Sequence, residues 1–270
     1  MFSKFNYSPS DGFFSGILNK HFTNGSRLYA NHEKEVHDCL SKYITEDGVL
    51  NGTLLKEHWF SISHKDVFIS HSHCDINKVK AFAGWLYDCF GLEAFIDSCS
   101  WGYCNDLLQI IDKKYCCHPT TNIYDYDLRN YTTSHVHIML STALTEMIYN
   151  TECIFFFNTP HSISLAEELG KIEKKRKKET TLSPWIYHEL SMTTMLHPIE
   201  PDHSGTIIEH YTRDSREKPT VQYDISKALA EMPTLTDEHL KQWAERWEKR
   251  PIKDKEEALD ELYKIVFPRC

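Results

Sequence analysis

The most regular stretch of the chain alternates short apolar runs with one amphipathic segment. Asp66–Ser70 reads DVFIS, which is typical of a buried parallel strand. Apolar residues then recur at helical spacing, and Gly91 provides a C-terminal stop for that helix. Leu92–Ile96 is a second apolar run. Residues 66–97 therefore have the order and the size of a βαβ unit.

The next part of the chain interrupts this rhythm. A helix is expected to open at Asp106–Ile111. Residues 113–133 contain adjacent cysteines, a proline and several tyrosines, and we interpret them as an inserted surface loop. Thr133 or Ser134 is then expected to cap a helix that runs to about Asn150.

The C-terminal part resumes the alternation. Ser183 followed by Pro184 predicts a helix start, because serine favours the N-cap and proline the first helical position. The remaining predicted elements are strands at Cys153–Phe157 and Thr220–Ile225 and helices at 184–196, Thr236–Arg250 and Asp254–Phe267. This alternation predicts a doubly wound α/β fold, in which ligands bind outside the carboxyl ends of the strands.

The domain organisation follows from this pattern. Residues 1–64 are expected to form an N-terminal extension, packed on the main domain and containing a short amphipathic helix at His32–Ile44. The main domain covers residues 65–225, and residues 226–270 form C-terminal helices.

Charge narrows the classes of function. The chain has 270 residues, with 30 Lys plus Arg against 39 Asp plus Glu, so its net charge is −9. A nucleic-acid-binding protein needs a positive footprint, so this balance argues against nucleic acid as the partner. The basic run at residues 171–178, KIEKKRKK, is therefore expected to be a solvated face.

The nine cysteines do not indicate a secreted scaffold, because their number is odd and the N-terminus lacks a signal-peptide pattern. No apolar run approaches the ~20 residues that a transmembrane helix needs. The cysteine spacings match no common zinc pattern. We expect a cytoplasmic protein with free thiols, no metal and no membrane partner.

Polar residues follow each predicted strand, where a doubly wound sheet binds its ligands. Glycine-rich phosphate loops and the G-x-S-x-G hydrolase turn are absent from the sequence, so dehydrogenase, P-loop and α/β-hydrolase chemistry are disfavoured. Trp185 and Glu189 are four residues apart and share one helix face. Asp75 is expected to cap the helix that follows it. The other candidates at the strand ends are His71, Ser72, His73, Asp97, Ser98 and Trp101.

Three segments in order, DVFISHSHCD, GLEAFIDS and SPWIYHEL, resemble the successive motifs of the bacterial TIR (Toll/interleukin-1 receptor) domain. The resemblance covers about residues 65–225 and implies a flavodoxin-like fold. The long charged stretch before Ser183 and the insertion near 113–133 depart from the family pattern. By this resemblance, Glu189 falls on the catalytic glutamate of the enzymatic TIR domains.

The resemblance implies an NAD+ glycohydrolase or ADP-ribosyl cyclase-type enzyme of anti-phage defence. NAD+ would be the substrate, so no separate cofactor is implied. Self-association through TIR domains and a downstream effector that senses an ADP-ribose signal are the expected partners. Glu189 would stabilise the developing ribosyl cation. The expected substrate-binding residues are His71, Ser72 and Asp97 for ribose or phosphate groups, and Trp101 and Trp185 for stacking on a base.

Three alternatives remain open. A non-enzymatic TIR scaffold predicts that Glu189 lies in a salt bridge or faces away from the cleft. A nucleoside 2-deoxyribosyltransferase-like N-glycosidase would also use a glutamate in a flavodoxin-like fold. A nucleotide sensor would bind without cleaving. Trp185 could equally be a core residue, and Trp101 could belong to a subunit interface.

Overall fold

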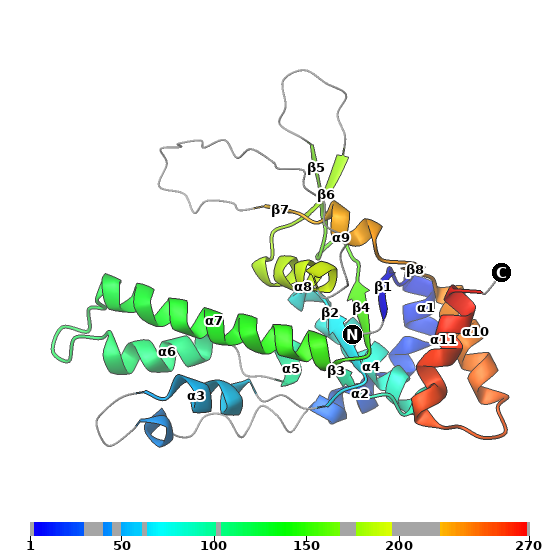
Figure 1. Cartoon of the computed structure of the whole chain (residues 1–270), viewed down its shortest axis with the longest axis horizontal. Coiled ribbons are helices and arrows are strands. Elements are labelled where there is room, and N and C mark those ends of the chain that lie inside the picture. The colour runs from blue at the N-terminus through cyan, green and yellow to red at the C-terminus, as the bar shows by residue number, and fades with distance from the viewer. Residues whose placement is uncertain are drawn as a thin grey trace.

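Five parallel strands form the central sheet of the computed structural model, which describes residues 3–29, 40–44, 50–60, 64–100, 104–167, 177–195 and 222–268 (Figure 1). The spatial order of the strands is β3-β2-β4-β1-β8, and every neighbouring pair is parallel. The strands are β1 (Ser3–Tyr7), β2 (Val67–Ser70), β3 (Ala94–Phe95), β4 (Cys153–Phe157) and β8 (Thr234–Leu235). The predicted α/β class with a parallel sheet is therefore confirmed.

A second, antiparallel sheet contains β5 (Ser164–Glu167), β6 (Lys177–Thr181) and β7 (Tyr223–Asp224). The strand predicted at Thr220–Ile225 is thus present over two residues, but it belongs to this smaller sheet and not to the main one. Most of the basic run 171–178 lies outside the described residues, and its last two residues open β6.

Helices connect and cover the strands. The longest is α7, which has 25 residues and extends away from the sheet beside α6 (Figure 1). The helices are α1 (Asp11–Gly16), α2 (Phe22–Tyr29), α3 (Gly52–Trp59), α4 (Ile76–Phe90), α5 (Asp97–Ser100), α6 (Cys104–Tyr115), α7 (Tyr126–Asn150), α8 (Pro184–Met195), α9 (Ser226–Ala230), α10 (Asp237–Glu248) and α11 (Ala258–Val266). Short 3₁₀ turns occupy Leu18–His21, Leu40–Tyr43, His73–Asp75 and Lys255–Glu257.

Both faces of the sheet are buried, and successive residues of β4 serve opposite faces. Cys153, Phe155 and Phe157 join the core under α2, α4, α10 and α11. Ile154 packs with residues of α3, α6 and α7, and Phe156 packs with residues of α8 and α9. A strand covered on both faces reads as a continuous apolar run, which explains the CIFFF sequence.

The N-terminal segment contributes more than an extension packed on the main domain. Its strand β1 lies inside the sheet, between β4 and β8, with Phe5 opposite Phe155. Lys4 points to the face that Phe5 does not occupy and is buried there. Its ammonium group donates to the carbonyl of Thr193 and to Glu231, both at 3.2 Å.

Several predicted helix ends are confirmed. Gly91 ends α4 in the left-handed conformation, with φ = 71°. Ser183 caps α8, since its hydroxyl accepts a hydrogen bond from the Ile186 amide at 3.2 Å. Thr236 forms a capping box at the start of α10. The helix predicted at His32–Ile44 lies mostly outside the described residues; its last part contains the 3₁₀ turn Leu40–Tyr43.

The surface-loop interpretation of residues 113–133 holds only for residues 116–125 and is wrong at both ends, which are helical. Helix α6 continues to Tyr115, and α7 begins two turns before the predicted cap, because Asp125 accepts a hydrogen bond from the Leu128 amide at 2.9 Å. Buried Asp112 on α6 then accepts hydrogen bonds from Arg129 (2.9 Å) and Thr132 (2.5 Å) on α7. This charge-assisted cluster stabilises the extra helical turns.

Gly84 sets the distance between α2 and α4. A Cβ atom added there would lie 2.3 Å from the His21 carbonyl oxygen, whereas one added at Gly16 would meet nothing within 4 Å. We expect Gly84→Ala to lower the free energy of unfolding by about 1–3 kcal/mol, the usual cost of overpacking. Gly16→Ala is the control and should leave stability unchanged or slightly raised. Equal denaturation midpoints for the two variants would contradict this account of the contact.

Candidate functional site

A pocket of about 260 Å³ lies where β2 and β3 end, beside the first half of α8. This is the carboxyl edge of the parallel sheet, where doubly wound folds bind ligands. Its lining combines two carboxyl groups, Glu189 of α8 and Asp97 at the start of α5, with polar groups that follow β2 and β3. The lining residues are His71, His73, Asp97, Ser98, Cys104, Asn105, Leu140, Ser183, Trp185, Ile186 and Glu189.

Glu189 is the most buried acidic group of this pocket, with 4% of its surface exposed. Ser70, the last residue of β2, donates its hydroxyl proton to Glu189 Oε2 at 2.5 Å. Burial raises the pKa of Glu189 well above 4.5, and the negative charge of Asp97 raises it further, while the Ser70 hydrogen bond opposes both effects. The surroundings of Glu189 therefore favour the neutral, protonated form of its carboxyl group.

No ion pair of the described residues involves Glu189. The side chain also lines the pocket and does not face away from it. A buried acid without a cationic partner destabilises its own charged form. The site is therefore arranged so that a positive charge entering the pocket would favour the carboxylate.

His71 is held in one orientation at the end of β2. Its Nδ1–H donates to the Ile69 carbonyl at 3.0 Å, and its Nε2 lies 3.2 Å from the Ser98 hydroxyl. With the proton on Nδ1, the neutral ring accepts from Ser98 through Nε2. Asp97 lies 3.9 Å from Nδ1. The histidine thus connects the segment after β2 to α5, which follows β3.

The sequence left open whether Trp185 is a core residue or a ligand contact, and the structure gives it both a core contact and a place in the pocket lining. Its indole packs against the core of α3, α6 and α7 and also lines the pocket. His137 of α7 contacts the ring at 5.5 Å, nearly at right angles. His188 lies on α8, the helix that also carries Trp185. It is half-buried, and burial lowers the pKa of its imidazole. Trp185 thus lines the pocket while its ring is held against α7.

The structure brings together four of the six predicted site residues: His71, Asp97, Trp185 and Glu189. Ser72 is not a lining residue; its carbonyl accepts the Asp75 amide at 2.9 Å. Trp101 lies outside the described residues.

Several lining residues were not assigned a binding role from the sequence. His73 and Ser98 lie in the polar segments that follow the predicted strands, and they were candidates there without an assigned role. Cys104 and Asn105 come from the start of α6 and line the pocket through tertiary packing alone.

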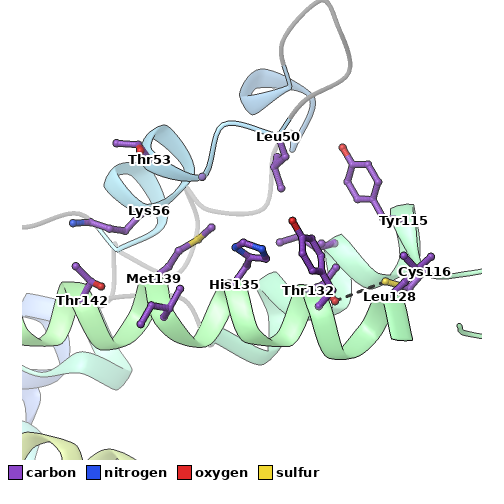
Figure 2. A pocket seen from close by; sticks show the side chains of 14 residues that line it. Leu50, Thr53, Lys56, Tyr115, Cys116, Leu128, Thr132, His135, Met139 and Thr142 are labelled. Carbon is purple, nitrogen blue, oxygen red and sulfur yellow. Dashed lines mark hydrogen bonds between the residues drawn. The ribbon is translucent and has the colours of Figure 1, made fainter. Parts of the chain in front are cut away.

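A larger hollow of about 770 Å³ lies elsewhere, between α3, α6 and α7 (Figure 2). His135 and Met139 point into it from α7, and Tyr115 borders it from α6 (Figure 2). Its two strongest polar groups are already engaged: Lys56 pairs with Glu146 at 2.6 Å, and Thr132 bonds Asp112. Because size alone supplies no chemistry, the smaller pocket with its buried acid is the better candidate for a reactive site.

No family model, no curated protein and no solved structure matches the chain. Fold and site together define an α/β protein with a five-stranded parallel sheet and an acid-bearing pocket at the carboxyl ends of its strands.

Other features limit the chemistry of the described residues. Cys74, Cys89, Cys104, Cys116, Cys117 and Cys153 are free thiols. No three His, Cys, Asp or Glu side chains of the described ranges are grouped to hold a metal ion. No helix within these ranges has both the length and the apolar character to cross a bilayer.

The raised pKa of Glu189 makes a prediction about stability. In the unfolded chain the carboxyl loses its proton near pH 4.5, but the folded protein retains it to higher pH. Between these two values the folded state binds more protons, so the wild type loses stability as the pH rises. Glu189→Gln removes this loss, so we expect the stability of the variant relative to the wild type to rise as the pH increases above 4.5, with no gain at pH 4.

Thermal denaturation over this pH range measures the effect. Glu245→Gln is the matched control, because Glu245 is exposed on α10. A Glu189→Gln gain that is the same at every pH would contradict the assignment of a buried, protonated acid.

Proposed function

We propose that the protein is a TIR-type enzyme that cleaves the nicotinamide–ribose bond of NAD+. The observation that carries this proposal is the buried Glu189, which has no cationic partner among the described residues and lines a pocket at the strand ends. The order of the sheet around β2, β3 and β4 supports a flavodoxin-like arrangement. The three sequence motifs meet at this pocket through His71, Asp97 and Glu189.

The chemistry suits this acid. Cleavage passes through an oxocarbenium-like state, and the leaving group is already a cationic pyridinium, so no strong general acid is needed. When the pyridinium enters, its charge favours ionisation of Glu189. The carboxylate then stabilises the positive charge that develops on the ribosyl carbon.

The pocket volume suits part of the substrate. At about 260 Å³ it lies below the usual range for a whole ligand of dinucleotide size. We assign the nicotinamide and its ribose to the pocket, with Trp185 against the ring and with His71 and Asp97 near the ribose hydroxyls. The rest of the dinucleotide would extend along the strand ends toward β4.

The biological setting is part of the same proposal. The family resemblance favours a cytoplasmic bacterial enzyme of anti-phage defence, which depletes NAD+ or makes an ADP-ribose-type signal for a downstream effector. It also favours self-association through the TIR domain, so the activity is expected to rise with protein concentration.

A nucleoside N-glycosidase is the second candidate, because a 260 Å³ pocket with one glutamate also suits a nucleoside. It predicts release of free base from nucleosides, with NAD+ left intact. A non-enzymatic scaffold predicts no turnover of either substrate. A panel of nucleosides assayed beside NAD+ separates these candidates.

The test is NAD+ consumption at high protein concentration, with products identified by mass spectrometry. We expect the wild type to release nicotinamide and Glu189→Gln to lose about 100-fold or more, since removal of one transition-state contact typically costs 10²–10³-fold. Glu245→Gln should keep wild-type activity. Wild-type turnover of NAD+ that survives in folded Glu189→Gln would overturn the assignment of the catalytic acid.

A further inference from the structure

Ser70, the last residue of β2, carries a hydroxyl group at a position where a buried parallel strand ordinarily has an apolar side chain. Alternation along β2 places Val67 and Ile69 in the core beside α4, and Phe68 in the core on the opposite face. Ser70 follows Phe68 on that second face, and only 1% of its surface is exposed. A buried hydroxyl destabilises the fold unless it has a hydrogen-bond partner. The partner of this hydroxyl therefore indicates its role.

Among the described residues, the Ser70 hydroxyl forms its one hydrogen bond with Glu189 Oε2, at 2.5 Å. This geometry suits the ionised acid, because a hydroxyl that donates to a carboxylate lies at ~2.5–2.7 Å. No hydrogen bond of the described residues involves the other oxygen, Oε1. Glu189 lines the pocket and Ser70 does not. Ser70 can therefore act on a ligand in this pocket only through Glu189.

The position of the hydroxyl is fixed by the backbone around it. β2 pairs with β4 as far as Ser70, which lies opposite Phe156. The next residue, His71, donates Nδ1–H to the Ile69 carbonyl at 3.0 Å. The end of β2 is therefore held on both sides of Ser70.

The segment that follows is anchored again at Asp75. This residue was expected to cap α4, and the expectation is wrong, because Asp75 occupies the N-cap position but its side chain makes no capping hydrogen bond. Its buried carboxylate instead accepts hydrogen bonds from the Thr159 hydroxyl at 2.5 Å and from His161 Nδ1–H at 3.0 Å, in the loop after β4. The strand end that carries Ser70 thus lies between two fixed points, its pairing with β4 and this contact.

The groups around Glu189 make the Ser70 hydroxyl the one that favours the carboxylate. Burial and the negative charge of Asp97 both raise the pKa of Glu189, whereas the Ser70 hydrogen bond lowers it. None of the described residues that line the pocket is a lysine or an arginine. The other titratable side chains of this lining are Asp97 of α5, His71 and His73 after β2, and Cys104 of α6.

The proposed cleavage of NAD+ needs the Glu189 carboxylate when positive charge develops on the ribosyl carbon. We propose that Ser70 is a positioning residue for this reaction: its hydroxyl holds Oε2 in place and leaves Oε1 to act on the ribosyl group. Because the donor is fixed in advance, little rearrangement accompanies ionisation of the acid. This inference rests on the proposed function, since it assigns Ser70 a role in that reaction.

The test exchanges the donor at position 70. Ser70→Ala removes the hydroxyl, Ser70→Cys replaces it with a weaker thiol donor, and Ser70→Thr retains a hydroxyl. Alanine is smaller than serine, whereas cysteine and threonine are larger. An effect of donor strength and an effect of side-chain volume therefore order the three variants differently. The measurements are kcat and KM for NAD+ across a range of pH.

We expect the activity to follow the donor. Ser70→Ala should lower kcat by about tenfold or more, because misplacing a catalytic group by about 1 Å costs up to ~10²-fold. KM should change little, because Ser70 does not line the pocket. Loss of the donor also raises the pKa of Glu189, so the acid limb of the kcat/KM profile, where the carboxylate gains its proton, should move to higher pH.

The other two variants test the order. Ser70→Cys should show smaller effects in the same directions, and it serves if Ser70→Ala does not fold. Ser70→Thr should keep the acid limb of the wild type.

Thr151→Val is the matched control. Thr151 is fully buried before the start of β4, at the opposite end of the sheet from the pocket, and its hydroxyl donates to the Met147 carbonyl at 2.6 Å. The substitution removes a buried hydroxyl without changing the surroundings of Glu189. It should lower stability and leave both kcat and the acid limb unchanged.

The outcomes separate this inference from the proposed function. An unmoved acid limb in folded Ser70→Ala or Ser70→Cys, or effects that follow side-chain volume, would overturn the role of Ser70 alone. A wild type that consumes no NAD+ would overturn the proposed function, and this inference with it.

Discussion

The structure depends on β4, a five-residue strand that is buried on both faces and paired on both edges. One edge binds β2, which begins the β2–α4–β3 unit, and the other binds β1, almost 150 residues earlier in the chain. This double pairing sets the positions of the strand ends. It places Ser70 beside Phe156, and it therefore determines where the loops after β2 and β4 meet. The Glu189 pocket and the hydrogen-bonded group of Asp75, Thr159 and His161 lie at that junction.

The electrostatics of Glu189 are unfavourable for folding, and this points to a function. A buried acid that only supported the structure would be expected to pair with a cation, as Asp112 does with Arg129. Glu189 has the Ser70 hydroxyl and a second acid, Asp97, in its surroundings. Such an arrangement destabilises the carboxylate until a cation arrives. Burial destabilises the Glu189 carboxylate, and a positively charged ligand beside it would remove this destabilisation. The site therefore favours ligands with a positive charge.

The sequence predicted the fold where local pattern and tertiary role agree. β4 was predicted to the residue, because both of its faces need apolar side chains. β1 was not, because Lys4 and Asn6 alternate with Phe5 and Tyr7 and suggest a solvated face. Lys4 is buried only because Thr193 and Glu231, far away in the chain, accept its ammonium protons. No local pattern contains that information.

The candidate site was predictable in part for the same reason. Glu189 and Trp185 share a helix face by spacing, and His71 and Asp97 follow strands, so four lining residues could be named in advance. The burial of Glu189 and its bond to Ser70 come from packing α8 against the sheet. The start of α7 was misplaced because Asp125 and Thr133 are both good caps, and the contacts of Asp112 on a neighbouring helix decide between them.

The segment from His71 to Asp75 connects the Glu189 pocket to the loop after β4, at the carboxyl edge of the sheet. Its first residue, His71, lines the pocket together with Glu189, and its last, Asp75, binds the loop after β4. Both ends are buried and hydrogen-bonded, so the turn keeps the two groups at a fixed separation. A compact ligand would need only one of them. A ligand that extends along this edge of the sheet would meet both groups, and the segment between them keeps their separation fixed.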